Sequence, residues 1–121
     1  MVKLIRRECM GEERYFCFSL RVLDNAAAKF GGTDAIFEAI DGPEGIGNVA
    51  WLAAALMDGG HRVAVKRGLA DPAPVSADDI LDELGVAEIN ALKSIIFATI
   101  ANDSEAEVSV ETKENPTEEA E

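Results

Sequence analysis

Residues 15–20 alternate with a period of two. Phe16, Phe18 and Leu20 are each separated by one other residue, and a period of two is typical of a β-strand. A second strand-like segment, VKLIRREC, precedes them, and the tetrapeptide MGEE lies between the two segments. The pattern predicts a β-hairpin over residues 2–19.

At Ser19 the pattern changes to that of a helix. Apolar residues now recur at intervals of three and four, which places them on one helix face; they are Leu20, Leu23, Ala27 and Phe30. Ser19 is suited to cap the start of this helix, and Gly31 and Gly32 supply the left-handed residue that ends it. A second, short helix is predicted to carry Ile36, Phe37 and Ile40. It should stop before DGPEGIG, because proline and glycine break helices.

The third predicted helix runs from residue 46 to residue 57 and is apolar on several sides. Its stripe consists of Ile46, Val49, Leu52, Ala53 and Leu56. Trp51 and two alanines leave little polar surface on the rest, and such a helix is usually central in a domain or part of an interface. We expect Gly59 and Gly60 to interrupt it. The conformation of residues 59–75, helical or extended, stays open.

The segment ADPAPVSADDILDELG predicts a fourth helix. Its two prolines keep the chain extended up to Ser76, which is suited to cap a helix. Ile80, Leu81 and Leu84 are expected to face inward, and Gly85 to end the helix.

A last helix is predicted from Val86 to Ala101. Its apolar stripe consists of Ile89, Leu92, Ile96 and Ile100. From residue 103 onward hydrophobicity falls, and residues 103–121 hold eight acidic side chains against one basic side chain. Low hydrophobicity with high net charge is typical of disorder, so an acidic disordered tail is expected over residues 103–121.

The composition favours one mainly helical domain. Of 121 residues, 48% are hydrophobic and only 6% are aromatic, so the chain can bury a core without disulfides. Abundant alanine favours closely packed helices over a broad sheet. We expect a mainly α fold, in which an N-terminal β-hairpin is followed by a bundle of about four to five short helices. A single globular domain should cover residues 1–102.

Charge and hydropathy argue against two kinds of partner. The net charge is −12, and a strongly acidic chain repels a phosphate backbone, so we expect no nucleic acid partner. The longest mainly apolar stretch, residues 49–57, is shorter than the roughly 20 residues that cross a bilayer. The N-terminus lacks an apolar block followed by a cleavage site. We therefore expect no membrane partner and a cytoplasmic location.

Cys9 and Cys17 are the two cysteines of the chain. A cross-strand disulfide would need hairpin pairing centred near Glu13, and a cytoplasmic chain of this size does not require one. Neither cysteine has CxxC spacing or a nearby histidine. We expect two reduced thiols without redox or nucleophilic chemistry.

No pattern in the sequence indicates a catalytic, cofactor or metal site. The glycines of GPEGIGN have neither the order of a GxGxxG motif nor the lysine of a phosphate-binding loop, so a loop is expected there. His61, the one histidine, lacks a second ligand at metal-binding spacing and is interpreted as solvated loop or helix edge. The acidic residues 78–83 are expected to offset a helix dipole. We expect no enzyme activity and no cofactor.

One apolar cluster has two interpretations, the protein core and a surface for another protein. The candidate partner-binding residues are Trp51, Leu52, Leu56, Met57, Ile95 and Phe97. Core packing explains most of these side chains. The alternative is an exposed groove or oligomer contact, because apolar surfaces rimmed by charge often bind proteins.

The order of the elements resembles the tail assembly chaperones of long-tailed bacteriophages and related prophage elements. A basic, alternating hairpin leads into FSLRVLDNAAAKFGG, and the short DAIFEAI helix and the apolar NVAWLAAALMDGG follow. SADDILDEL then precedes a final apolar helix and an acidic tail. The resemblance covers roughly residues 2–102 and includes Leu20 and Arg21 ahead of FGG and the tryptophan of the third helix.

The resemblance implies binding without catalysis. Such proteins coat the long, largely helical tape measure protein while the tail tube polymerises around it, and they are absent from the finished virion. A spare apolar groove would cover the apolar stripes of that protein, and net negative charge would keep the complex soluble. The implied partner is the phage tape measure protein, in the cytoplasm of the bacterial host cell, and a homo-oligomer is also expected.

Two alternatives stay open. The chain could be a small phage or prophage structural protein, such as a virion connector, which would persist in finished particles. It could also be a helix-turn-helix regulator that uses the two helices on either side of Gly85, although the second of these helices offers a single basic residue to DNA.

Overall fold

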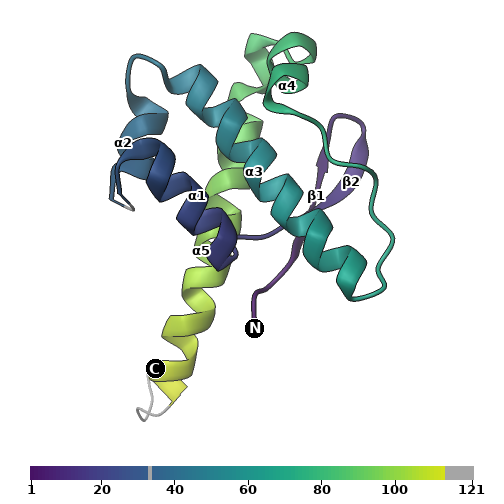
Figure 1. The fold of residues 1–121 in the computed structure, drawn as a ribbon, viewed down its shortest axis with the longest axis vertical. Coiled ribbons are helices and arrows are strands. Elements are labelled where there is room, and N and C mark those ends of the chain that lie inside the picture. Colours follow the sequence, from purple (N-terminus) through teal and green to yellow (C-terminus); the bar gives the residue numbers. More distant parts are fainter. Residues whose placement is uncertain (33, 114–121) are drawn as a thin grey trace.

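The computed structural model describes residues 1–32 and 34–113 and shows a mainly helical fold (Figure 1). An N-terminal two-strand antiparallel hairpin is followed by five helices, as predicted. A short 3₁₀ helix, Val86–Glu88, precedes the last of them. The strands and helices are β1 (Ile5–Cys9), β2 (Glu12–Phe16), α1 (Leu20–Phe30), α2 (Ala35–Asp41), α3 (Gly45–Lys66), α4 (Ala77–Glu83) and α5 (Ile89–Lys113).

The hairpin closes through a two-residue turn at Met10 and Gly11. Both residues have positive φ angles, 54° and 83°, as the tight turns favoured in hairpins require. Ile5 lies opposite Phe16, so the pairing is centred on this turn and not near Glu13. Cys9 and Cys17 therefore do not face each other, and both are free and buried, as expected.

Helix α1 begins and ends where the sequence predicts, but its buried face is shifted from the predicted stripe. Leu23 and Phe30 of that stripe are half-buried and pack against the core. The Ser19 hydroxyl accepts a hydrogen bond from the backbone N–H of Val22 at 3.3 Å, and Gly31 ends the helix at a φ of 93°. The predicted stripe included Leu20, which is 83% exposed, whereas Val22 and Ala26 are buried. The contact with α3 explains this difference, because the Val22 side chain packs directly against Gly59.

Helix α3 continues through the glycine pair that was expected to interrupt it. It extends to Lys66 without a break. A methyl group on Gly59 would lie 2.7 Å from Cγ2 of Val22, and one on Gly60 would overlap the carbonyl of Tyr15. The two glycines are therefore positions of close approach, where α1 and β2 pack against the backbone of α3.

Residues 67–76 form the connector between α3 and α4. The sequence left open whether residues 59–75 are helical or extended, and the structure shows a helix up to Lys66 followed by an irregular connector. Gly68 adopts a φ of 76°, and the backbone N–H of Leu69 donates to the Ala64 carbonyl at 2.9 Å, which closes the helix end. The chain then runs without regular secondary structure to Ser76, whose hydroxyl accepts from the Asp79 N–H at 3.1 Å and caps α4.

Helices α4 and α5 differ from the predictions in two details. In α4 Ile80 is buried, but Leu81 is 45% exposed and does not face inward, because a two-turn helix has room for only a narrow buried stripe. Helix α5 continues to Lys113, so residues 103–113 belong to a helix where a disordered tail was predicted. Extending an existing helix needs no new nucleus, and alanine and glutamate are good helix formers. Residues 114–121 lie outside the described residues.

Helix α3 is the centre of the core. It contacts β2, α1, α2, α4 and α5, and Figure 1 shows it crossing in front of α5, while the last turns of α5 project beyond the rest of the domain. The largest fully buried side chains include Phe16, Leu52, Leu56, Met57 and Ile96. This arrangement leaves the outer surfaces of α2 and α5 for other contacts.

Candidate functional site

Four of the six apolar residues singled out in the sequence lie in the core. Leu52, Leu56 and Met57 are fully buried, and Ile95 is 7% exposed. A partner cannot reach these side chains while the domain is folded, which corrects their placement among the partner-binding candidates. Their physical role is packing between α3, the hairpin and α5.

Trp51 and Phe97 lie nearer the surface. Trp51 is half-buried and meets Phe30 edge to face, with ring centroids 5.5 Å apart and Lys29 Nζ 5.3 Å from the Trp51 centroid. This contact joins α1 to α3 and is therefore structural. Phe97 is 42% exposed and stacks on Phe37, which is 46% exposed, at a centroid distance of 5.7 Å.

The stacked phenylalanines belong to a surface that we call the α2–α5 seam. Its members are Phe37, Asp41, Ile46, Ile89, Lys93 and Phe97. One turn beyond the aromatic pair, Lys93 Nζ lies 3.8 Å from Asp41 Oδ1. Position 37 meets 97 and position 41 meets 93, so the two helices run in opposite directions along the seam.

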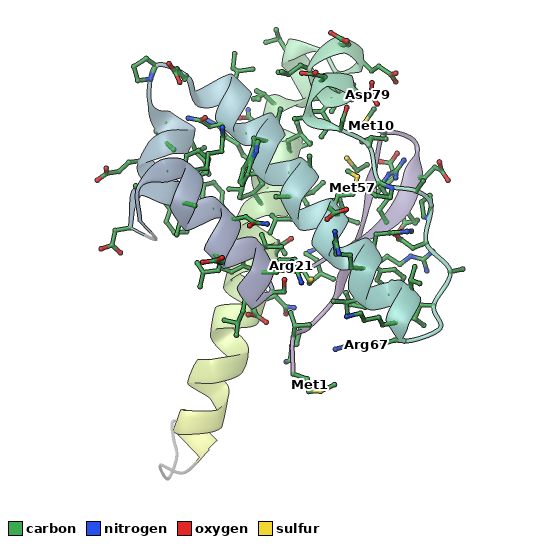
Figure 2. The ribbon with its side chains drawn as sticks, viewed as in Figure 1. Met1, Met10, Arg21, Met57, Arg67 and Asp79 are labelled. Carbon is green, nitrogen blue, oxygen red and sulfur yellow. The ribbon has the colours of Figure 1, made fainter. Side chains whose placement is uncertain are left out.

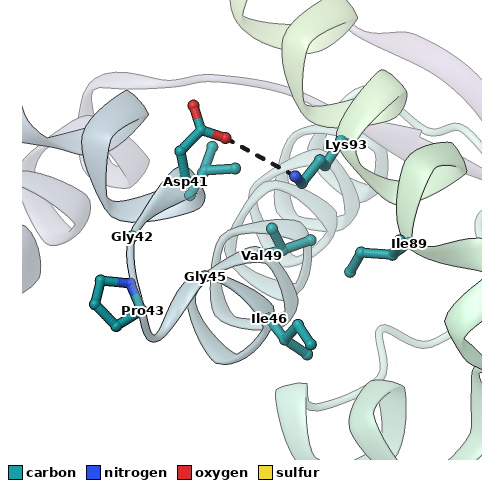
Figure 3. Close-up of a pocket in the computed structure, with 9 residues that line it drawn as sticks. Asp41, Gly42, Pro43, Gly45, Ile46, Val49, Ile89 and Lys93 are labelled. Atoms are coloured by element: carbon teal, nitrogen blue, oxygen red, sulfur yellow. Dashed lines mark ion pairs between the residues drawn. The ribbon is translucent and has the colours of Figure 1, made fainter.

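The far end of the seam is a hollow of about 300 Å³ beside the start of α3. Figure 3 shows Ile89 pointing from α5 toward Val49 of α3, while Lys93 reaches across to Asp41. Ile46, at the rim, is 64% exposed. The hollow is thus lined both by apolar side chains and by the Asp41–Lys93 ion pair, and it lies next to the exposed aromatic pair.

The segment GPEGIGN builds the rim of this hollow. Its residues 42–44 form the predicted loop, whereas residues 45–48 already belong to the first turn of α3. Gly42 ends α2, and the Gly45 N–H donates to the Gly42 carbonyl at 3.0 Å. A side chain at Gly45 would overlap the carbonyl of Ile40. Asn48 Nδ2 donates to the Ala39 carbonyl at 2.8 Å, which satisfies an acceptor that the end of α2 leaves free.

A second polar arrangement holds the connector of residues 67–76 against the hairpin. Arg14 is 3% exposed; its Nε donates to the Cys9 carbonyl at 2.9 Å and its Nη1 to the Ala73 carbonyl at 2.8 Å. Asp71 accepts from the Tyr15 N–H at 2.9 Å, and its other oxygen lies 2.8 Å from His61 Nδ1. His61 thus lies on α3 and fixes the connector, and it is not part of a solvated loop.

Met57 links this polar arrangement to the core. In Figure 2 it lies on α3 near the hairpin and the connector, and its sulfur is 3.3 Å from the Val75 N–H. These contacts satisfy buried polar groups, as expected for a structural cluster.

The two thiols lie in surroundings that disfavour ionisation. Burial raises the pKa of both the Cys9 and the Cys17 thiol. When the pKa of a thiol is higher in the folded than in the unfolded state, the unfolded state loses the proton first as pH rises. The contribution of the buried thiols to the free energy of unfolding is therefore intact below the unfolded thiol pKa of about 8.5 and is lost as pH rises past it. A thiolate is also the reactive form.

We therefore expect slow labelling of both thiols by a disulfide reagent in native buffer and fast labelling in denaturant. We also expect the free energy of unfolding to fall as pH rises above about 8.5, less steeply in a Cys9→Ala, Cys17→Ala variant. Rapid native labelling, or equal slopes in the two proteins, would contradict the burial of these groups.

Among residues 1–32 and 34–113 there is no group of three or more histidine, cysteine, aspartate or glutamate side chains that could hold a metal ion. No single helix in this part of the chain has the length and apolar composition of a membrane span. Helix α4 and residues Val86–Asp103 meet that criterion only when taken together, and the chain bends by 119° between them.

Comparison with protein-family models, curated proteins and solved structures finds no match to this chain. The candidate site therefore rests on the seam itself. Sequence reasoning found Phe97 but missed Phe37, Asp41 and Lys93 as its neighbours. Phe37 carried one usable signal, since it falls beside the i, i+4 pair of buried isoleucines, Ile36 and Ile40.

Proposed function

We propose that this chain acts as a phage tail assembly chaperone-like protein, which binds the tape measure protein and keeps it soluble while the tail tube assembles. The observation that carries the proposal is the α2–α5 seam, where Phe37 is 46% and Phe97 is 42% exposed beside a hollow that Ile46, Val49 and Ile89 help to line. Scattered apolar side chains are common on surfaces, but a stacked aromatic pair next to a hollow is typical of a protein-binding site. A net charge of −12 would keep the complex in solution.

The proposal describes binding without catalysis or cofactor, in the cytoplasm of a bacterial host cell. It involves neither nucleic acid nor membrane. Weak self-association into a homo-oligomer is part of the proposal, because an exposed seam on one copy can contact another when no partner is present.

A long, largely helical protein encoded next to this chain would be the candidate tape measure protein, and co-expression with it tests the proposal. We expect the soluble fraction of the tape measure protein to rise severalfold when this chain is present. Phe97→Ser should remove most of that gain, because it takes an apolar anchor from the seam. Leu20→Ser is the matched control, since Leu20 is an exposed apolar residue outside the seam. A tape measure protein that is equally insoluble with and without this chain would overturn the proposal.

The two alternatives give different results. A virion structural protein would be found in purified particles, whereas a chaperone would be absent from them. A regulator would bind duplex DNA with a steep salt dependence. The 119° bend between α4 and the next helix suits a helix-turn-helix, but α4 exposes Asp78, Asp79 and Asp82, and Lys93 is paired with Asp41.

A further inference from the structure

We infer that the α2–α5 seam selects a helix in which a lysine or arginine lies midway between two large apolar residues. The inference rests on the proposed function, in which another protein covers the seam, and it specifies the chemistry of the segment that does so. Three levels of the seam carry it: the aromatic pair, the ion pair and the hollow.

The spacing of these levels fits a helix lying along α5. Phe97, Lys93 and Ile89 are four residues apart, and each residue of a helix rises about 1.5 Å, so the aromatic pair and the hollow are roughly 12 Å apart. A helix of the partner covers that distance with residues i and i+7 or i+8. Residue i would contact the Phe37–Phe97 pair, and residue i+7 or i+8 would enter the hollow. This is the spacing of anchors in helix-in-groove recognition.

The middle level favours a cation. The Asp41 side chain is 78% exposed and its partner Lys93 is 32% exposed, with 3.8 Å between the charged atoms. This separation leaves the Asp41 carboxylate free to accept a second, closer cation. Residue i+4 of the partner helix lies at that level, where a lysine or arginine would pair with Asp41.

The surrounding charge points the same way, and it keeps contact between two copies of this chain weak. Glu38 follows Phe37 in α2, Glu44 lies between the hollow-lining residues Pro43 and Gly45, and both glutamates are exposed. The chain as a whole carries a net charge of −12, so two copies repel each other while a basic segment is attracted. The occupant is therefore a basic amphipathic helix of another protein.

Fluorescence anisotropy with two labelled synthetic helical peptides and the 121-residue chain tests the inference. Both peptides carry leucine at positions i and i+7, and the residue at i+4 is lysine in one and glutamate in the other. We expect the wild-type protein to bind the lysine peptide about tenfold more tightly. Added salt should reduce this preference, because exposed charge pairs are screened.

Asp41→Lys should reverse the preference between the two peptides. Glu83→Lys is the matched control: it makes the same change of charge on α4, outside the seam, and should keep the preference for lysine. Asp41→Asn serves as a second variant, which should lose the preference for the lysine peptide, because it removes the carboxylate and leaves Lys93 without its partner. Circular dichroism melts establish that each variant is folded.

The inference would be overturned if the wild-type protein bound both peptides equally or bound neither. It would also be overturned if the seam bound a second copy of the chain and no peptide, which Phe97→Ser would reveal by abolishing the self-association. Its failure is distinguishable from failure of the proposed function. Solubilisation of the tape measure protein without charge selection would leave the proposed function intact and remove only this inference.

Discussion

Gly60→Ala should destabilise the domain by roughly 3 kcal/mol or more, near the upper end of the cost of overpacking. The added methyl group would overlap the Tyr15 carbonyl and lie 2.6 Å from Cα of Phe16. These are backbone atoms of β2, which cannot rotate away as a flexible side chain can. The hairpin would have to move off α3 and weaken the hydrogen bond from the Cys17 N–H to the Leu56 carbonyl, which is 3.2 Å long.

Gly47→Ala is the matched control in the same helix. Nothing lies within 4 Å of a methyl group at Gly47, so the substitution should stabilise the protein by about 0.5 to 1 kcal/mol through helix propensity alone. Urea denaturation followed by circular dichroism measures both variants. Similar effects of the two substitutions would show that β2 does not pack closely on α3.

Arg14→Leu should cost about 3 kcal/mol. The guanidinium is almost fully buried and donates to two backbone carbonyls, those of Cys9 and Ala73. Leucine would leave both acceptors without this donor, and it would release the connector from the hairpin. Glu12, whose carboxylate is 3.6 Å from Arg14 Nη2, is largely exposed and contributes little to this cost.

Arg6→Leu removes the same charge from the neighbouring strand and serves as the control. Arg6 is exposed, 3.8 Å from Glu13 and 5.3 Å from the Tyr15 ring centroid, and such surface contacts are worth about 1 kcal/mol or less. Thermal unfolding of the two variants, together with proteolysis of residues 67–76, measures the difference. If Arg14→Leu matches Arg6→Leu in both measurements, the connector is not held by Arg14.

Local signals predicted where α1 and α4 begin and end, but not the end of α3 or the bounds of α5. Ser19 and Ser76 cap helices as expected, because a serine oxygen accepts a helix N–H over a distance of only three residues. The prediction for the glycine pair at 59 and 60 was wrong, because no signal nearby in the sequence bears on it. Its role depends on Val22 and Tyr15, which are far away in the sequence, and helix propensity alone carries no information about them.

The candidate site was predicted only in part. Phe97 stood out because it lies beside the buried stripe of α5, and Phe37 lies beside the buried residues of α2 in the same way. An apolar residue that lies beside the buried stripe of its helix was therefore the signal that could have indicated both phenylalanines. The contact between Asp41 and Lys93 had no such signal, since two charged residues on separate helices meet only after α2 and α5 have packed.

The central claim is tested most directly by nuclear magnetic resonance. The isotope-labelled protein is titrated with a soluble helical fragment of the tape measure protein, and the chemical-shift changes are mapped onto the structure. The α2–α5 seam is predicted to show the largest chemical-shift changes, centred on Phe37, Asp41 and Phe97. The hairpin and residues 67–76 should change little. Changes confined to the hairpin and that connector, or no changes at saturating fragment, would contradict the claim that this chain binds its partner through the seam.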